Sequence, residues 1–308
     1  MEFPFVGSSS QAGYRGRFAP TPSGPLHLGS LLTALASYLQ ARQQKGRWLL
    51  RIDDLDRPRI AADAEGRILR QLEAHGLLWD DPPRRQSDHL PDYHAALDRL
   101  RAQGLIYACA CTRAQLMQQS LPGPDGLVYN GHCRGLGLPE EGLALRLRVP
   151  TERLQIIDAG QGGQSRQLER ELGDFVLRRR DGIFGYQLAC AVDEHAQGIT
   201  EVVRGVDLLS STFFQLHLMH RLRLRVPSYR HLPLLTDTGD RKLSKQNHAV
   251  AIEESQASHN LSLCLELLGQ NPPPALKRAS VTEIVAWGIT HWSAERIPKR
   301  HSLVVGSL

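Results

Sequence analysis

One stretch near the start of the chain decides the fold, Arg15-Gly-Arg-Phe-Ala-Pro-Thr-Pro-Ser-Gly-Pro-Leu-His-Leu-Gly-Ser30. Residues 14–18 read as a short strand, a loop with three prolines follows, and an apolar helix is expected to begin near Gly29 or Ser30. In an α/β sheet this order presents backbone N–H groups and a positive helix end to phosphate. His27 stands at the junction, where it can donate to a phosphate oxygen, and Gly29 lets a nucleotide approach the backbone. Taken alone, the pattern also fits a stiff turn with a surface histidine.

A second candidate phosphate-binding segment lies more than 200 residues downstream. The string Lys242-Leu-Ser-Lys-Gln246 follows a Gly-Asp turn and places Lys242 and Lys245 around a small hydroxyl residue. Two flexible ammonium groups suit the triphosphate of ATP, whose negative charge builds during attack at the α-phosphorus. A lone Lys-x-x-Lys pair is usually a solvated charge run. The interpretation of this segment as phosphate-binding therefore depends on the presence of the first motif.

Together, His-Leu-Gly-Ser and Lys-Leu-Ser-Lys-Gln resemble the two signature motifs of class I aminoacyl-tRNA synthetases. The longer string that ends at Ser30 resembles the glutamyl/glutaminyl branch. The resemblance covers roughly residues 14–250 and implies an α/β fold with a Rossmann-type catalytic domain. It implies ATP as a substrate, accompanied by Mg²⁺, with His27, Gly29, Lys242 and Lys245 as catalytic residues and His27, Gly29, Ser30 and Lys245 as ATP-binding residues.

Length and composition set the outer bounds. The chain has 308 residues, of which 41% are hydrophobic and 22% charged, and its formal net charge is +5. These values are ordinary for a soluble globular protein, and the basic excess is compatible with a polyanionic partner. No run of about 18 apolar residues exists, so we expect no membrane contact. Residues 1–13 lack the features of a signal peptide and read as a flexible lead-in.

The cysteine content indicates a reducing compartment. Five cysteines, an odd number, with two of them one residue apart, argue against a disulfide framework. We therefore expect a cytoplasmic protein, and we expect it to be a monomer. Cys190 and Cys264 have no partner by spacing and are interpreted as buried apolar residues.

The order of predicted elements gives the domain organisation. Residues 46–53 read as a buried strand that completes a βαβ unit, so a parallel sheet is expected. Helical periodicity at 61–76 and 92–104, a loop at 159–167 and a hairpin at 174–186 follow. We predict a first catalytic half at 14–105, an insertion with a zinc site at 106–185, a second catalytic half with the Lys-Leu-Ser-Lys-Gln loop at 186–250, and a short helical C-terminal region without an anticodon-binding domain at 251–308.

The insertion carries three cysteines with the composition of a zinc site. Cys109 and Cys111 are followed by Tyr129, His132 and Cys133. On chemistry alone His132 is the more usual fourth ligand, but it adjoins Cys133, and neighbouring residues rarely ligate one ion together. Tyr129, four residues before Cys133, has the better reach. Unliganded thiols in a loop-rich insertion are the remaining alternative.

The spacing Cys-x-Cys-x17-Tyr-x3-Cys is similar to the zinc site of the glutamyl-queuosine tRNA(Asp) synthetases, short paralogues of glutamyl-tRNA synthetase. In that family the tyrosine is the fourth ligand, so the resemblance implies one Zn²⁺ held by Cys109, Cys111, Tyr129 and Cys133. Four protein ligands leave no open position, so the implied site is structural.

The same resemblance implies a pocket for L-glutamate. The implied contacts are Arg17, Phe18, Ala19, Pro20, Thr21, Asp53, Tyr186 and Arg204. A substrate with two carboxylates and one ammonium suits two guanidinium forks and one acid. Members of the family usually carry Glu where this chain has Asp53, and the shorter side chain would reach the amino group through a water or with a slightly shifted backbone.

The implied reaction is attack of glutamate on the α-phosphorus of ATP, followed by transfer of glutamate to the queuosine base at the wobble position of tRNA(Asp). One rival is a truncated glutamyl-tRNA synthetase that charges a tRNA 3′ end. Another is an inactive synthetase paralogue that only binds tRNA or a partner, and a third is a nucleotidyltransferase with the same histidine motif.

Overall fold

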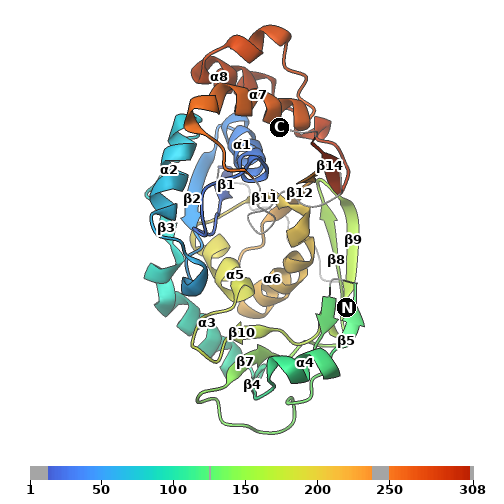
Figure 1. Ribbon diagram of the computed structural model, residues 1–308. Coiled ribbons are helices and arrows are strands. Elements are labelled where there is room, and N and C mark those ends of the chain that lie inside the picture. The colour runs from blue at the N-terminus through green and yellow to red at the C-terminus, as the bar shows by residue number, and fades with distance from the viewer. Residues whose placement is uncertain (1–12, 125, 238–249, 306–308) are drawn as a thin grey trace.

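A parallel sheet forms the centre of the computed structural model, which describes residues 13–124, 126–237 and 250–305 (Figure 1). Strand β1 (Arg15–Phe18) pairs in parallel with β2 (Arg47–Ile52), which pairs with β3 (Arg84–Arg85). On the other side of β1, β11 (Glu201–Gly205) is joined to it by a hydrogen bond from the amide of Thr200 to the carbonyl of Arg15. Strand β12 (Ser228–Leu232) pairs in parallel with β11. Two parallel ladders, β3-β2-β1 and β11-β12, thus lie side by side and meet between β1 and β11.

Both faces of this sheet are buried, as the sequence of β2 requires. Trp48, Leu50 and Ile52 pack in the hydrophobic cluster that contains helix α1 (Leu28–Gln43), and Leu49 packs in the cluster on the opposite face. Alternate side chains of a strand point to opposite faces, so a continuous apolar run is what a strand covered on both sides needs.

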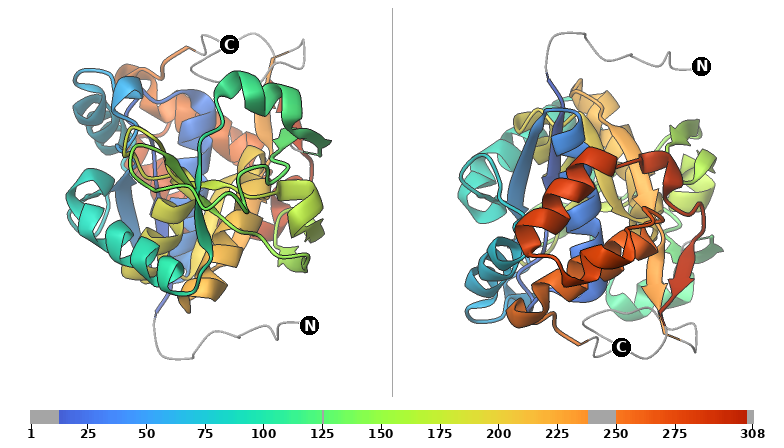
Figure 2. Two further views of the ribbon diagram at one scale, coloured as in Figure 1. Left: turned by 90° about the horizontal axis from the view of Figure 1, so that it is seen from below. Right: turned by 90° about the horizontal axis from the view of Figure 1, so that it is seen from above.

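Helices cover each face. On one face, α7 (Ala257–Leu267) and α8 (Val281–His291) pack against α1, as the view from above in Figure 2 shows. A Cβ at Gly288 of α8 would lie 3.1 Å from Leu39 of α1, so the two helices are in close contact there. The other face is covered by helices that pack on one another, α3 (Leu90–Ala102), α5 (Tyr186–Ala196) and α6 (Leu209–Leu222).

The remaining elements are short. Helix α2 (Ala64–Ala74) precedes β3. Short 3-10 helices occur at Arg57–Arg59, Gln86–His89, Val206–Leu208, Glu254–Gln256, Pro274–Arg278 and Ala294–Arg296, and a π-helical turn at Leu168–Leu172. None of the helices in the described part of the chain combines the length and the apolar character needed to cross a bilayer.

The segment between the two halves of the sheet is mainly antiparallel. Strand β7 (Ala144–Leu147) pairs with both β4 (Ile106–Cys109) and β10 (Val176–Arg178). Helix α4 (Arg113–Gln119) leads to a hairpin of β5 (Leu121–Gly123) and β6 (Gly126–Val128). A longer hairpin joins β8 (Arg153–Asp158) to β9 (Gly162–Gln167), and the amide of Ala159 binds the carbonyl of Tyr229 on β12. Late in the chain, β13 (Leu234–Thr236) pairs in parallel with β14 (Ser302–Val304).

Most predicted elements are present, with three differences. Helix α1 begins at Leu28, slightly before the expected start, because the ring of His27 accepts from the amide of Ser30 and caps the helix. The loop predicted at 159–167 was wrong over its last six residues, since residues 162–167 form β9; Gly and Gln have weak strand propensity, but pairing with β8 supplies the ladder. The hairpin predicted at 174–186 closes through one bridge, Arg178 to Phe184.

Candidate functional site

A pocket of about 310 Å³ lies at the carboxyl ends of β1 and β11. Open α/β sheets place their ligands at this edge. The pocket brings together ten of the residues singled out in the sequence: Arg17, Phe18, Ala19, Pro20, Thr21, His27, Gly29, Ser30, Tyr186 and Arg204. Lys242 and Lys245 lie outside the described residues.

His27 is set at the start of α1 with a defined ring orientation. Its Nδ1 accepts a hydrogen bond from the amide of Ser30 at 3.3 Å, so the neutral ring carries its proton on Nε2. An Nε2–H is a donor suited to a phosphate oxygen, and the helix terminus beside it contributes partial positive charge. His27, Gly29 and Ser30 line the pocket together, where such donors would suit a phosphate group.

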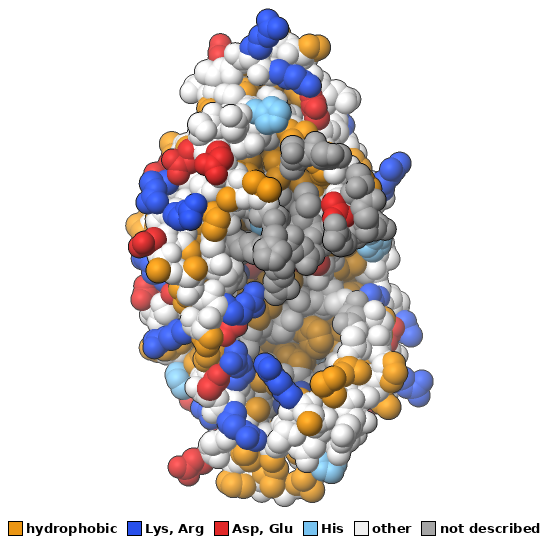
Figure 3. Space-filling view, in the orientation of Figure 1, with side chains coloured by type: hydrophobic (Ala, Val, Ile, Leu, Met, Phe, Trp, Pro, Cys, Tyr) orange, Lys and Arg blue, Asp and Glu red, His pale blue; other side chains and the backbone are white. Residues whose placement is uncertain are grey.

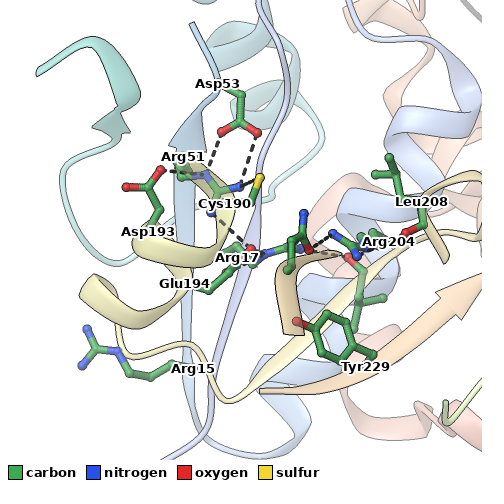
Figure 4. A network of polar contacts seen from close by, with 12 residues as sticks. Arg15, Arg17, Arg51, Asp53, Cys190, Asp193, Glu194, Arg204, Leu208 and Tyr229 are labelled. Carbon is green, nitrogen blue, oxygen red and sulfur yellow. Dashed lines mark hydrogen bonds and ion pairs between the residues drawn. The ribbon is translucent and has the colours of Figure 1, made fainter. Parts of the chain in front are cut away.

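Arg17 enters the pocket already paired. Its Nε lies 3.0 and 3.1 Å from the two carboxylate oxygens of Glu194 on α5, and its Nη1 donates to the carbonyl of Val203 at 3.2 Å (Figure 4). Arg17 is 3% exposed and Glu194 1% exposed. Burial works against the charged form of Glu194, but the guanidinium groups of Arg17 and Arg51 outweigh it and lower the pKa of Glu194.

Asp53 is not among the residues that line this pocket. Its carboxylate is engaged by Arg51, with Nε to Oδ1 at 2.7 Å and Nη2 to Oδ2 at 3.3 Å. Strand β2 alternates its side chains, so Arg51 and Asp53, two residues apart, lie on the same side. Burial dominates and raises the pKa of Asp53, although Arg51 opposes the shift. A role of Asp53 towards the substrate amine stays a prediction.

Arg51 is the centre of a buried ionic cluster that sequence reasoning missed. Its side chain is fully buried and its Nη1 lies 3.2 Å from Glu194. Its Nη2 donates to the sulfur of Cys190 at 3.3 Å, so Cys190 is buried but not in apolar surroundings as predicted. Burial raises the pKa of Cys190 to about 12. The cluster balances three arginines against three carboxylates, namely Arg17, Arg51 and Arg84 with Asp53, Asp193 and Glu194.

Arg204 differs from Arg17 because its partners are neutral. Its Nη1 donates to Gln215 at 2.9 Å, and its Nη2 donates to Thr212 at 2.7 Å and to the carbonyl of Leu208 at 3.2 Å. Its Nε donates to Nε2 of His231 at 3.1 Å. Both arginines that were predicted to bind substrate carboxylates are therefore already hydrogen-bonded within the protein. Each can offer a substrate only its remaining N–H groups.

Tyr186, which the sequence had singled out, is 38% exposed at the first position of α5.

Other residues that line the pocket had not been singled out. Asp207 and Leu208 follow β11, and Leu234 and Leu235 belong to β13. The place of Asp207 and Leu208 directly after β11 is the one signal that could have found them, because ligands gather at the carboxyl ends of strands in a parallel sheet.

The first motif is tied to the residues that follow the lysine segment. The amide of Ile252 donates to the carbonyl of Leu26 at 3.0 Å, and His27 forms a bridge with Ala251. Gln71 of α2 closes the arrangement, since its Oε1 accepts from the amide of Leu26 and its Nε2 donates to the carbonyl of Ile252, each at 2.8 Å.

A second candidate site is formed by three thiols and a phenol. The sulfur atoms of Cys109, Cys111 and Cys133 lie within 4.8 Å of one another. The hydroxyl of Tyr129 is 3.5 Å from the sulfurs of both Cys109 and Cys111. His132 is exposed, whereas Cys109, Tyr129 and Cys133 are buried. The structure thus gathers the set that contains Tyr129.

Arg146 of β7 supplies positive charge to this cluster. Its guanidinium lies 3.9 Å from the centroid of the Tyr129 ring. Burial works against the thiolate of Cys109, but hydrogen bonds from Tyr129 and Arg146 prevail and lower its pKa to about 7. A depressed thiol pKa favours the form that binds metal.

The chain matches the family model described as tRNA synthetases class I (E and Q), catalytic domain, over residues 14–268. It is 49% identical over 296 residues to a glutamyl-Q tRNA(Asp) synthetase of Pseudomonas fluorescens, which covers 96% of this chain and 97% of that protein. It is 48% identical over 285 residues to a glutamyl-Q tRNA(Asp) synthetase of Thiobacillus denitrificans, which covers 92% of this chain and 94% of that protein.

Two solved structures share the fold. One is the crystal structure of a glutamate tRNA ligase from Elizabethkingia meningosepticum in complex with its amino acid, with a TM-score of 0.78 and 25% identity over 94% of this chain and 66% of that one. The other is the glutamate-tRNA synthetase from Elizabethkingia anophelis, with a TM-score of 0.79 and 25% identity over 95% of this chain and 68% of that one. The present chain spans about two thirds of the length of these proteins.

Proposed function

The chain belongs to the class I tRNA synthetase family for glutamate and glutamine, and we propose that it activates L-glutamate with ATP and transfers it to the queuosine base of tRNA(Asp). The observation that carries the proposal is near-full-length identity of 49% and 48% to two relatives named glutamyl-Q tRNA(Asp) synthetase. The pocket supports it, because it joins two buried arginines to a histidine at a helix start.

In this proposal, the two arginines hold the carboxylates of glutamate. Their contacts with Glu194, Val203 and the partners of Arg204 fix each guanidinium before the substrate arrives. Preorganised donors lose little freedom on binding, so they bind a carboxylate more tightly than mobile ones. Tyr186, at the mouth of the pocket, contributes its ring and hydroxyl.

The activation step needs positioning rather than a general base. A carboxylate oxygen of glutamate forms a bond to the α-phosphorus of ATP, and the bond to the bridging oxygen breaks, so pyrophosphate leaves and glutamyl-adenylate remains. The nucleophile is already ionised, so no proton has to be removed. His27 and the start of α1 stabilise the charge on the phosphate oxygens, and Lys245 is proposed to act with them. Mg²⁺ carried by ATP would neutralise part of the phosphate charge.

We propose that Cys109, Cys111, Tyr129 and Cys133 hold one zinc ion with a structural role. Zinc with Zn–S bonds of about 2.3 Å needs sulfurs roughly 4 Å apart, which the observed cluster allows. The ion would join the end of β4 to the segment after β6, which is not paired with β4 as a strand.

The acceptor reaction requires an RNA surface near the pocket. The face drawn in Figure 3 is hollowed below its centre, and Lys and Arg side chains gather along one side of the hollow. Such a surface binds the phosphate backbone without reading sequence. We also propose a cytoplasmic location, because ATP and tRNA are available there.

The test is ATP–pyrophosphate exchange with glutamate in the absence of tRNA, followed by glutamate transfer to queuosine-containing and queuosine-free tRNA(Asp). We expect exchange without tRNA and transfer only to the queuosine-containing RNA. Lys245→Ala should abolish exchange, while Lys299→Ala, an exposed residue distant from the pocket lining, should not. Exchange that requires tRNA(Glu) would favour a truncated glutamyl-tRNA synthetase. Absence of exchange under all conditions would favour a binding paralogue.

A further inference from the structure

Arg204 is the last member of a buried chain of three side chains. Nδ1 of His231 lies 2.6 Å from Oδ2 of Asp158, and Nε2 of His231 lies 3.1 Å from Nε of Arg204. Asp158 is 1% exposed, His231 0% and Arg204 3%. Three elements contribute one residue each, since Asp158 ends β8, His231 is on β12 and Arg204 is on β11.

The strand register places this chain with little freedom. Arg204 and His231 are direct partners in the parallel pairing of β11 and β12, so their side chains emerge side by side. Tyr229, two residues before His231, lies on the same side, with its ring stacked near that of His231 and 5.4 Å from the guanidinium of Arg204.

Asp158 fixes the tautomer of His231. Its Oδ1 accepts from the amides of Gly160, Gln161 and His231 at 2.8 to 3.1 Å, which leaves Oδ2 to accept from Nδ1. With the proton on Nδ1, Nε2 of the neutral ring has a lone pair. A guanidinium has no lone pair to offer, so the bond between Arg204 and His231 forms only with this tautomer.

The consequence for Arg204 is a fixed orientation and an undiminished charge. Its other hydrogen-bond partners, Thr212, Gln215 and the carbonyl of Leu208, are neutral. Among the described ion pairs, none joins a carboxylate to Arg204, whereas Arg17 is paired with Glu194. A neutral His231 separates Arg204 from Asp158, so the arginine is held firmly without being neutralised by direct contact with an acid.

We propose that Asp158 and His231 are positioning residues that hold Arg204 for the side-chain carboxylate of the amino-acid substrate and make the pocket prefer that carboxylate over an amide. The proposal rests on the proposed function, in which glutamate is the substrate. Asp158 lies in the segment between the two halves of the sheet, so that segment contributes directly to substrate selection.

Asp158→Asn tests the chain at its far end. The amide can keep its oxygen for the backbone donors while its NH₂ faces Nδ1 of His231, which moves the ring proton to Nε2 and sets it against the Nε–H of Arg204. We expect KM for glutamate to rise about 10- to 100-fold, the usual effect of losing a hydrogen bond to a charged group. We expect kcat and KM for ATP to change less than about threefold, and discrimination against glutamine to fall.

Two variants of His231 separate its two bonds. His231→Gln can retain an acceptor near the position of Nε2, and His231→Asn can retain a donor near that of Nδ1. We expect the Gln variant to stay closer to the wild type in KM for glutamate, and the Asn variant to resemble Asp158→Asn. A purely structural role would instead lower the melting temperature of both variants and leave KM for glutamate unchanged in the folded fraction.

Nitrogen-15 NMR of histidine in the full chain reports the arrangement without substrate. The wild type should show His231 protonated on Nδ1, and Asp158→Asn should shift the proton to Nε2. A wild-type ring protonated on Nε2, or a wild-type KM for glutamate in Asp158→Asn despite the tautomer change, would overturn the inference. If the wild type lacks glutamate-dependent exchange altogether, the proposed function fails first and this inference falls with it; normal exchange with unaltered variants refutes the inference alone.

Discussion

Arg17 and Glu194, 177 positions apart in the sequence, form a buried pair in which the Nε of Arg17 lies 3.0 and 3.1 Å from the two carboxylate oxygens. The pair fixes the guanidinium on the wall of the pocket. Glu194 therefore holds a pocket-lining side chain in place although it does not line the pocket itself.

Replacement of Glu194 by Gln should lower both stability and glutamate binding. Removing one partner of a buried ion pair costs about 3 kcal/mol of unfolding free energy. We expect urea denaturation to show this loss. KM for glutamate should rise at least about tenfold, because the guanidinium of Arg17 is no longer held in one orientation. Glu73→Gln, an exposed position on α2, is the matched control and should be neutral.

The acid dependence of the same variant has a definite sign. The folded-state pKa of Glu194 is lowered, so its contribution is present above the ordinary value of about 4.5 and is lost as the pH falls through the folded-state pKa. The stability difference between wild type and Glu194→Gln should thus shrink in acid. A difference that stays constant from pH 7 to pH 3 would contradict the pairing.

Gln71→Leu should loosen the link between Leu26, which precedes His27, and Ile252, which follows the lysine segment. The change leaves the amide of Leu26 and the carbonyl of Ile252 without their side-chain partner, at a cost of about 1–3 kcal/mol for each buried group. We expect a lower melting temperature and a higher KM for ATP with KM for glutamate little changed. Gln71→Glu keeps the acceptor alone and should be intermediate; an ATP KM equal to wild type in both variants would show that the link has no role in the site.

The fourth ligand of the proposed zinc site can be decided by two substitutions. Tyr129→Phe keeps the ring beside Arg146 but removes the hydroxyl, whereas His132→Ala alters an exposed side chain. We expect the first to weaken zinc binding at least about tenfold in a chelator competition and the second to leave it unchanged. The reverse result would assign the ligand to His132, and zinc-free wild-type protein with an unchanged melting temperature would remove the structural role.

We expect His217 to make the free energy of unfolding depend on pH. It is 3% exposed on α6, and burial, aided by Arg221 and His220, lowers its pKa to about 3. A lowered folded-state pKa means that the unfolded chain binds the proton first, so stability falls as the pH drops below about 6.5.

The expected slope from one such group is about 1.4 kcal/mol per pH unit between pH 6 and pH 4. His217→Leu should remove this slope, as measured by urea denaturation at several pH values. The exposed His259→Gln should retain it. Parallel curves for wild type and His217→Leu would show that His217 is protonated in the folded protein.

The sequence predicted the parts of the molecule that local pattern controls. The strand before residue 18, the helix after His27 and the strand at 46–53 follow from apolar runs and turn residues, and they are confirmed. Family resemblance named ten residues that line one pocket, although their roles and the predicted domain boundaries stay predictions.

Long-range pairing accounts for what the sequence did not reveal. Nothing near Arg204 indicates that His231 and Asp158 complete its surroundings, because the contacts arise only when β8, β11 and β12 come together. Asp53 was expected to meet the substrate amine because it follows a strand of the sheet and because the family resemblance implies that role; the sequence did not reveal that Arg51, two residues earlier, binds its carboxylate. The strand at 162–167 likewise exists only through its neighbour.

The C-terminal region is continuous with the catalytic unit rather than an appendage to it. Helix α1, whose first turn borders the pocket, has α7 and α8 packed along it, with Gly288 against Leu39. Leu234 and Leu235, which line the pocket, belong to the strand that pairs with β14. Exchange of residues 251–305 between relatives would therefore disturb the packing that supports the pocket, so this region is not expected to behave as a module that can be swapped independently.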